Sequence, residues 1–171
     1  MNKALFLDRD GVINEDCHYP HKPEQIVFRE GIFDLCRFAS DKGYLIVVVT
    51  NQAGVAKGYF TEEDLISLHE WMREQFLDEG IAITSFYYCP CHPDAVHDRY
   101  RQRSPFRKPA PGMVLQAVDE HIIDLTKSLM VGDKQSDRIA VEGLRSLILK
   151  SKYTQNDYDI TSLEEVYEYL T

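Results

Sequence analysis

Apolar and polar positions alternate along the chain in blocks that predict a repeated strand–helix order. Short, undivided apolar runs are typical of parallel strands buried on both faces, and apolar residues recurring every three or four positions indicate helices between them. This order predicts an α/β fold of Rossmann type, a three-layer sandwich with a central parallel sheet. The predicted strands are residues 3–8, 44–50, 83–89, 128–133 and 146–150, and the predicted helices are residues 31–42, 61–76, 112–122, 136–143 and 161–170.

The length and the apolar runs limit the class of protein. A chain of 171 residues without a linker, repeat or low-complexity segment predicts one domain spanning residues 1–171. The longest apolar run, residues 44–49, has the length of a strand and is too short to cross a membrane. The first ten residues reach two aspartates before an apolar signal segment could form. We therefore expect a cytoplasmic protein that has no membrane partner.

The charge is unevenly distributed. A formal net charge of -9 argues against a general affinity for nucleic acid or anionic membranes. Residues 99–108 nevertheless carry five basic side chains and no acidic one. Such a segment is either a solvated charge run or a local anion site. Its position in the loop that leaves the third predicted strand favours the anion site.

Polar side chains follow the predicted strands at the points where these strands end. Asp8 and Asp10 follow the first strand, Thr50 and Asn51 end the second, and Asp133 ends the fourth. In open parallel sheets, ligands bind at the carboxyl ends of the strands, which all lie at one edge. Lys108 closes the long loop 90–111 at the same edge. We therefore expect these side chains to converge on one site.

Carboxylates, a hydroxyl and a lysine at one edge suit the chemistry of phosphate esters. Two or three carboxylates form an oxygen site for Mg²⁺, and a carboxylate can also act as a covalent nucleophile. The Thr50 hydroxyl, the backbone N–H groups of Asn51 and Gln52, and the Lys108 ammonium could bind phosphoryl oxygens. Each feature alone has an ordinary alternative, a capping aspartate or a solvated lysine. Their ordered appearance at one edge favours the phosphate site.

The motifs resemble those of a known superfamily. DxDG at residues 8–11, the apolar strand that ends in Thr50 and Asn51, Lys108, and GDxxxD at residues 132–137 resemble the four motifs of the haloacid dehalogenase (HAD) superfamily. Within it, the segments FLDRDGVIN, VVVTNQAGVAKGYFTE, FYYCPCHP, RKPAPGM and MVGDKQSD resemble the D-glycero-D-manno-heptose 1,7-bisphosphate phosphatases. Histidinol phosphatases are close relatives of these. The resemblance implies a HAD-like fold and a Mg²⁺-dependent phosphatase.

The resemblance also implies a role for each matching residue. Asp8 would be the nucleophile that takes the phosphoryl group, and Asp10 the general acid and then the general base. The Asp8 side chain, the Asp10 backbone carbonyl and Asp133 would bind Mg²⁺. The transferred phosphate would be bound by Thr50, Asn51 and Lys108. The second phosphate of a bisphosphate would be reached by Arg107, and the metal site would be supported by Lys134 and Asp137.

The spacing of the motifs predicts an open site. The intervals from Asp8 to Thr50 and from Thr50 to Lys108 are occupied by core elements, which leaves no room for a cap domain. Short loops at residues 18–22, 54–59 and 90–107 should then supply substrate specificity.

The long loop raises the question of zinc. Members of the resembled family carry a structural zinc there, held by a Cys-x-His pair and a Cys-x-Cys pair. This chain has Cys89 and Cys91 at the first pair, with His92 adjacent, and Ser104-Pro105-Phe106 where the second pair should stand. Structural zinc needs four ligands, so we expect the loop to lack zinc, with Cys89 and Cys91 as residual ligands at most.

Several functional alternatives stay open at this point. A histidinol-phosphate phosphatase or another small sugar-phosphate phosphatase would use the same motifs. A polynucleotide 3′-phosphatase is disfavoured by the acidic net charge. An inactive HAD domain that serves as a binding module is disfavoured because Asp8, Asp10, Lys108 and Asp133 are all present. The expected partner is a small phosphorylated sugar, and the expected state is a monomer.

Overall fold

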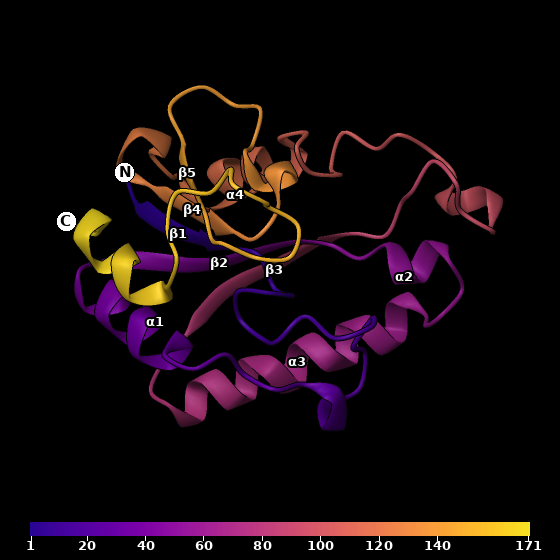
Figure 1. Cartoon of the computed structure of the whole chain (residues 1–171), viewed down its shortest axis with the longest axis horizontal. Coiled ribbons are helices and arrows are strands. Elements are labelled where there is room, and N and C mark those ends of the chain that lie inside the picture. Colours follow the sequence, from indigo (N-terminus) through magenta and orange to yellow (C-terminus); the bar gives the residue numbers. More distant parts are fainter.

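The centre of the protein is a five-stranded parallel sheet, seen in the computed structural model, which describes all 171 residues (Figure 1). The strand order is β3-β2-β1-β4-β5, so β1 lies in the middle with β2 and β4 beside it. The carboxyl end of β1 is therefore flanked by the ends of both neighbours. The strands are β1 (Lys3–Leu7), β2 (Tyr44–Asn51), β3 (Ile83–Cys89), β4 (Leu129–Gly132) and β5 (Arg145–Ile148).

Helices cover both faces of this sheet, as the strand and helix pattern predicted. In Figure 1, α1 (Ile32–Asp41) and α3 (Glu62–Asp78) lie below the sheet and α4 (Gly112–His121) lies above it. Successive side chains of a strand point to opposite faces. Leu5 and Leu7 of β1 accordingly enter a core of 24 buried residues with α1 and α3, while Ala4 and Phe6 enter a core of 13 with α4. The predicted three-layer α/β sandwich is confirmed.

Helix α3 shows how local sequence fixes an element. Thr61 and Asp64 form a capping box, in which Asp64 N–H donates to Thr61 Oγ1 at 3.1 Å and Thr61 N–H donates to Asp64 Oδ2 at 3.0 Å. Its buried face then places Leu68, Met72 and Phe76 in the larger core. None of the helices combines the length and the apolar character that crossing a bilayer requires.

Two of the predicted helices are wrong. In place of the helix predicted at residues 136–143, the chain forms only a 3-10 turn over Gln135–Asp137. The Ala140 N–H donates to the Pro109 carbonyl instead of to a carbonyl of the preceding turn, so the helix does not continue. Residues 161–170 form a 3-10 helix over Leu163–Tyr169 instead of an α-helix. A 3-10 helix aligns positions three residues apart, and it thereby directs both Leu163 and Val166 into the core.

The intervals between the strands contain no cap domain. Between β1 and β2 the helical elements are a 3-10 turn at Pro23–Gln25 and α1, and between β2 and β3 they are the short helix α2 (Ala53–Ala56) and α3. The edge of the sheet where the strands end is therefore reached directly past short loops.

Candidate active site

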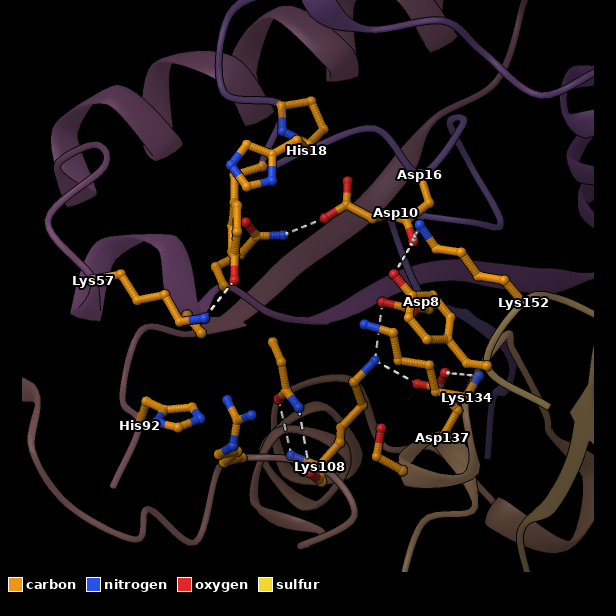
Figure 2. Close-up of a pocket in the computed structure, with 18 residues that line it drawn as sticks. Asp8, Asp10, Asp16, His18, Lys57, His92, Lys108, Lys134, Asp137 and Lys152 are labelled. Atoms are coloured by element: carbon orange, nitrogen blue, oxygen red, sulfur yellow. Dashed lines mark hydrogen bonds and ion pairs between the residues drawn. The ribbon is translucent and has the colours of Figure 1, made fainter. Parts of the chain in front are cut away.

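A cleft of about 530 Å³ opens at the carboxyl ends of the strands, within the ~300–1,000 Å³ typical of small-molecule sites. Asp8 and Asp10 line it after β1 (Figure 2). Asn51 and Gln52 line it at the end of β2. Each loop predicted to supply specificity also contributes lining residues. These are His18, Tyr19 and Pro20 from the first loop, Lys57 from the second, and His92 and Arg107 from the third.

Lys108 lies on the floor of the cleft between two carboxylates. Its Nζ atom is 3.0 Å from Asp8 Oδ1 and 2.5 Å from Asp137 Oδ1, and it also donates to the Val49 carbonyl at 2.9 Å. The Lys108 side chain is only 3 % exposed. All three protons of its ammonium group nevertheless have an acceptor. The residue that sequence analysis placed at this edge thus contacts Asp8 directly.

The buried charges shift one another's proton affinity. Burial alone would lower the pKa of Lys108, but the carboxylates of Asp137 and Asp8 raise it above its ordinary value. Burial, followed by the charge of Asp137, raises the pKa of Asp8 well above the ordinary value and that of Asp133 to about 6. The single lysine therefore does not balance the carboxylates around it. A further cation would favour their charged forms.

The carboxylate cluster suits a divalent cation. Oxygens of Asp8, Asp133 and Asp137 lie within 4.8 Å of one another. Asp133 Oδ1 is buried and has no hydrogen-bond partner, which leaves it available as a ligand. Asp137 is engaged elsewhere, because its Oδ2 accepts from the N–H groups of Asp133 and Lys134 at 3.1 and 3.2 Å and its Oδ1 binds Lys108. The geometry thus fits Asp8 and Asp133 as ligands, with Asp137 supporting them.

Gly11 allows this cluster to form. Its φ of +92° lies in the left-handed region, where side chains with a Cβ are strained. A Cβ added at this position would lie only 2.0 Å from Asp133 Oδ2. The close approach of the DxDG turn to Asp133 therefore requires glycine.

The end of β2 provides a polar wall. Gln52 Nε2 donates to Thr50 Oγ1 at 2.9 Å and to Asp10 Oδ2 at 3.1 Å. Asn51 exchanges hydrogen bonds with the backbone of Lys108, its Oδ1 accepting from Lys108 N–H at 2.9 Å. Thr50 itself is buried and does not line the cleft. These contacts connect β2 to both the DxDG turn and the loop that carries Lys108.

The residues that hold Asp10 were not predicted from the sequence. Arg9 is fully buried, and its Nε and Nη2 atoms donate to Asp10 Oδ1 at 3.0 and 2.9 Å. Asn14 Nδ2 donates to the same oxygen at 3.0 Å. Both residues lie within FLDRDGVIN, but a sequence pattern alone does not indicate that an arginine turns inward at this point. The Asp10 side chain is 23 % exposed and lines the cleft.

Only part of the basic segment 99–108 belongs to the site. Arg107 lines the cleft with Lys108, whereas Arg99 pairs with Glu62 at 3.3 Å and Arg101 pairs with Asp98 at 2.7 Å outside it. The prediction of an anion site is therefore wrong for the segment as a whole, because Glu62 and Asp98 pair with Arg99 and Arg101 in its first half. Lys57 and His92 lie on one flank of the cleft (Figure 2). Arg107 lies near His92, because its charge lowers the pKa of that ring.

The opposite flank is formed by the segment after β5. Tyr153 Oη donates to Asp16 Oδ2 at 2.5 Å and thereby joins residues that are far apart in the sequence. The Lys134 ammonium lies 4.5 Å from the centre of the Tyr153 ring, and Lys152 lines the cleft beside it. Lys134 thus lies at the predicted edge, facing this flank.

Cys89, the last residue of β3, and Cys91, in the long loop after it, are both buried. Gln102 Nε2 donates to the Cys91 sulfur at 3.4 Å, and burial raises the pKa of the Cys91 thiol. His92 Nδ1 accepts the Asp94 N–H, so this ring nitrogen is turned away from the thiols. The one group of three metal-ligating side chains in the protein is the carboxylate cluster. The expected lack of zinc stays a prediction.

Comparison with known proteins identifies the family. The profile of the polynucleotide kinase 3 phosphatase family matches residues 14–164. The chain belongs to this family. A family relative from Burkholderia mallei, a D-glycero-alpha-D-manno-heptose-1,7-bisphosphate 7-phosphatase, is 52% identical over 80% of this chain and 72% of its own. The corresponding beta-anomer phosphatase of Yersinia pestis is 46% identical over 78% of this chain and 71% of its own.

Solved structures agree with this placement. A HAD-like phosphatase from Mesorhizobium loti has a TM-score of 0.86 and 34% identity over 99% of this chain and 84% of its own. The D,D-heptose 1,7-bisphosphate phosphatase of B. bronchiseptica, solved with magnesium and phosphate, has a TM-score of 0.81 at 23% identity, over 97% of this chain and 98% of its own, and so shares the fold. The predicted HAD-like fold and HAD-superfamily phosphatase are confirmed.

Proposed function

We propose that the protein is a Mg²⁺-dependent phosphatase that removes the C7 phosphate of D-glycero-D-manno-heptose 1,7-bisphosphate through an aspartyl-phosphate intermediate. The observation that carries this proposal is the position of Asp8, whose carboxylate faces the cleft 3.0 Å from the Lys108 ammonium, with Asp10 directed into the same cleft. The names of the relatives from B. mallei and Y. pestis support the substrate.

In the first step, an Asp8 carboxylate oxygen attacks the phosphorus and forms an acyl-phosphate bond. The bond between phosphorus and the C7 oxygen of the sugar breaks, and Asp10 gives its proton to that oxygen, so the sugar leaves as an alcohol. Lys108 stabilises the negative charge on Asp8 and on the phosphoryl group that joins it.

In the second step, Asp10 takes a proton from water, and the resulting hydroxide attacks the phosphorus. The bond between phosphorus and the Asp8 oxygen breaks, which releases inorganic phosphate and regenerates both aspartates. The Gln52 amide, which donates to Asp10 Oδ2 at 3.1 Å, and Asn14 hold this carboxyl group at the cleft while its proton changes place.

Asp8 and Asp133 would hold Mg²⁺ together with the Asp10 carbonyl, and Asp137 and Lys134 would support that arrangement. When bound, the ion would neutralise charge on the carboxylates and the phosphoryl oxygens. The Thr50 hydroxyl and the Asn51 backbone N–H would bind the phosphoryl oxygens from the other side. The prediction that the Gln52 N–H would do the same is wrong, because this group donates to the Cys89 carbonyl at 2.8 Å.

The cationic flank favours a bisphosphate over histidinol phosphate. Arg107 and Lys57 both line the cleft, and Lys57 lies on the same side of it as His92 (Figure 2). The leaving group would extend along this side. Burial and the nearby Arg107 charge lower the pKa of His92, so that its ring is neutral and adds no charge. A second phosphate would pair with this flank, whereas the ammonium group of histidinol phosphate would be repelled by it.

A steady-state panel tests the proposal. Phosphate release from heptose 1,7-bisphosphate, histidinol phosphate and an oligonucleotide 3′-phosphate would be compared with Mg²⁺ and with a chelator. We expect the highest kcat/KM for the heptose, phosphorus NMR signals that show loss of the C7 phosphate, and no turnover with chelator or in Asp8→Asn. Asp119→Asn, a change at an exposed aspartate, should behave as wild type. A preference for histidinol phosphate or the oligonucleotide would overturn the substrate assignment.

A further inference from the structure

Arg9 contacts a residue that lies outside the cleft. Its Nη2 atom donates to Asp10 and to the Pro20 carbonyl, the latter at 2.8 Å. Its Nη1 atom lies 3.2 Å from Nε2 of His69 in α3. His69 does not line the cleft, and sixty positions of the chain separate it from Arg9. The guanidinium therefore connects the carboxyl group of Asp10 to the imidazole of a buried helix residue.

The surroundings of His69 make it an acceptor for Arg9. The residue is 5 % exposed, and its ring stacks on Phe86 with the centroids 4.7 Å apart and an interplanar angle of 19°. Burial, followed by the charges of Arg9 and Arg73, holds the pKa of His69 well below its ordinary value. The imidazole is therefore neutral, and with its proton on Nδ1 it can accept from Arg9 Nη1 through Nε2.

We propose that His69 is a positioning residue for the reaction, holding the Arg9 guanidinium in the orientation that supports Asp10 as the general acid. This inference rests on the proposed function. A guanidinium presents its donors in a rigid planar fork, so fixing Nη1 against His69 also fixes the direction of Nε and Nη2. Those two atoms make the contacts with Asp10 Oδ1 at 3.0 and 2.9 Å.

The electrostatics of proton donation explain why this orientation matters. As Asp10 gives its proton to the leaving oxygen, its carboxyl group becomes negatively charged. A positive guanidinium that is already aimed at that group stabilises the charge as it forms and needs no reorganisation. If Arg9 were free to rotate, part of this stabilisation would be lost. The loss would be largest for leaving groups that need a proton and small for those that do not.

A pair of amide substitutions separates positioning from packing. A glutamine at position 69 can place an amide oxygen where Nε2 of the imidazole lies, whereas the shorter asparagine reaches only the position of Nδ1. His69→Gln should therefore keep the acceptor for Arg9, and His69→Asn should lose it. Both variants introduce a polar side chain of similar chemistry. Met72→Ala, one turn further along the same buried face of α3, serves as a control for loss of core packing.

The readout is kcat/KM for two substrates with different leaving groups, heptose 1,7-bisphosphate and p-nitrophenyl phosphate, whose phenolate leaves without a proton. We expect His69→Asn to lower kcat/KM for the heptose by about tenfold or more, a part of the ~10²–10⁴ that general acids supply. The value for p-nitrophenyl phosphate should change less than about twofold, because that substrate does not draw on the general acid. His69→Gln should keep the wild-type ratio of kcat/KM between the two substrates. Met72→Ala should lower the melting temperature without changing that ratio.

Two results would overturn the inference. The first is a His69→Asn variant that melts cooperatively and keeps the wild-type ratio of kcat/KM between the two substrates. The second is an equal loss of kcat/KM on both substrates in His69→Asn and in Met72→Ala. A wild-type protein that hydrolyses neither substrate would instead overturn the proposed function itself. The two failures are therefore distinguishable in the same experiment.

Discussion

The Nζ atom of Lys108 lies 3.0 Å from Oδ1 of Asp8, at the bottom of the cleft where the parallel strands end. The two residues come from a strand end and from the end of a long loop, and Asp137 binds the same ammonium at 2.5 Å. In this buried trio, Lys108 opposes the burial and the Asp137 charge that raise the pKa of Asp8, and it holds the Asp8 carboxyl group at the cleft. It also determines what should happen when one member is removed.

Lys108→Met should abolish turnover and destabilise the fold. The substitution leaves the carboxylates of Asp8 and Asp137 buried without their shared cation, and breaking a buried ion pair in this way costs about 3 kcal/mol or more. We expect a lower free energy of unfolding in urea at pH 7 and no measurable phosphate release. Lys127→Met, at an exposed lysine, should leave both quantities unchanged. Wild-type stability in Lys108→Met would contradict the ion-pair arrangement.

Between pH 5 and 7.5, the free energy of unfolding of the metal-free protein should fall as pH rises. The folded-state pKa of Asp133 is raised from 3.8 to about 6, so in this range the folded chain binds more protons than the unfolded chain. Its stabilising contribution is full below about pH 4 and is lost as pH rises through 6. A bound cation removes this loss, so Mg²⁺ should raise the melting temperature more at pH 7.5 than at pH 5.

Asp133→Asn is the matched variant for that measurement. It removes a buried charge that has no hydrogen-bond partner on Oδ1, so without metal the variant should lose less stability between pH 5 and 7.5 than wild type. Its melting temperature should also respond little to Mg²⁺, because a charged ligand is missing. An equal Mg²⁺ response in wild type and Asp133→Asn would show that the ion binds elsewhere.

Gly11→Ala should damage the site more than the fold. Both Gly11 and Gly31 have a positive φ, +92° and +86°, so alanine at either position costs about 1–2 kcal/mol of backbone strain. Only at Gly11 does the new Cβ also meet a side chain, Asp133, whereas nothing lies within 4 Å of a Cβ at Gly31. Gly11→Ala should therefore lose activity and Mg²⁺ response, and Gly31→Ala should lose only stability. Equal activity in the two variants would contradict this assignment.

Arg107→Met should change substrate preference. Arg107 faces the cleft, and a charge-assisted hydrogen bond to a second phosphate is worth roughly 1.5–3 kcal/mol, which corresponds to about tenfold or more in kcat/KM. We expect this loss for heptose 1,7-bisphosphate and none for p-nitrophenyl phosphate. Arg103→Met, at an exposed arginine of the same segment, provides the control. A similar loss on both substrates would mean that Arg107 acts on the transferred phosphate instead.

The sequence was sufficient to predict the sheet and the residues at its edge. Undivided apolar runs such as residues 44–50 are buried on both faces, and the carboxyl ends of parallel strands must meet at one edge. Asp8, Lys108 and Asp137 therefore come together as the motif order predicts. The family resemblance supplied the roles that spacing alone left open.

Contacts between side chains from separate elements could not be predicted in this way. The link from His69 to Arg9 depends on how α3 packs on the sheet, and no pattern in either segment encodes it. The pairing of Arg99 with Glu62 likewise depends on the path of the long loop. The 3-10 geometry of Leu163–Tyr169 follows from tertiary packing, since the apolar spacing there fits both kinds of helix.

The formation of a phosphoryl-enzyme at Asp8 is the central claim of the proposed mechanism. Enzyme, Mg²⁺ and heptose 1,7-bisphosphate would be mixed, quenched in acid within the first turnovers, digested and analysed by peptide mass spectrometry. We predict a phosphoryl group on Asp8 in the peptide that contains FLDRDGVIN, together with a sugar product that keeps its C1 phosphate. Turnover without phosphorylation of Asp8, or with the phosphoryl group on another residue, would contradict the account.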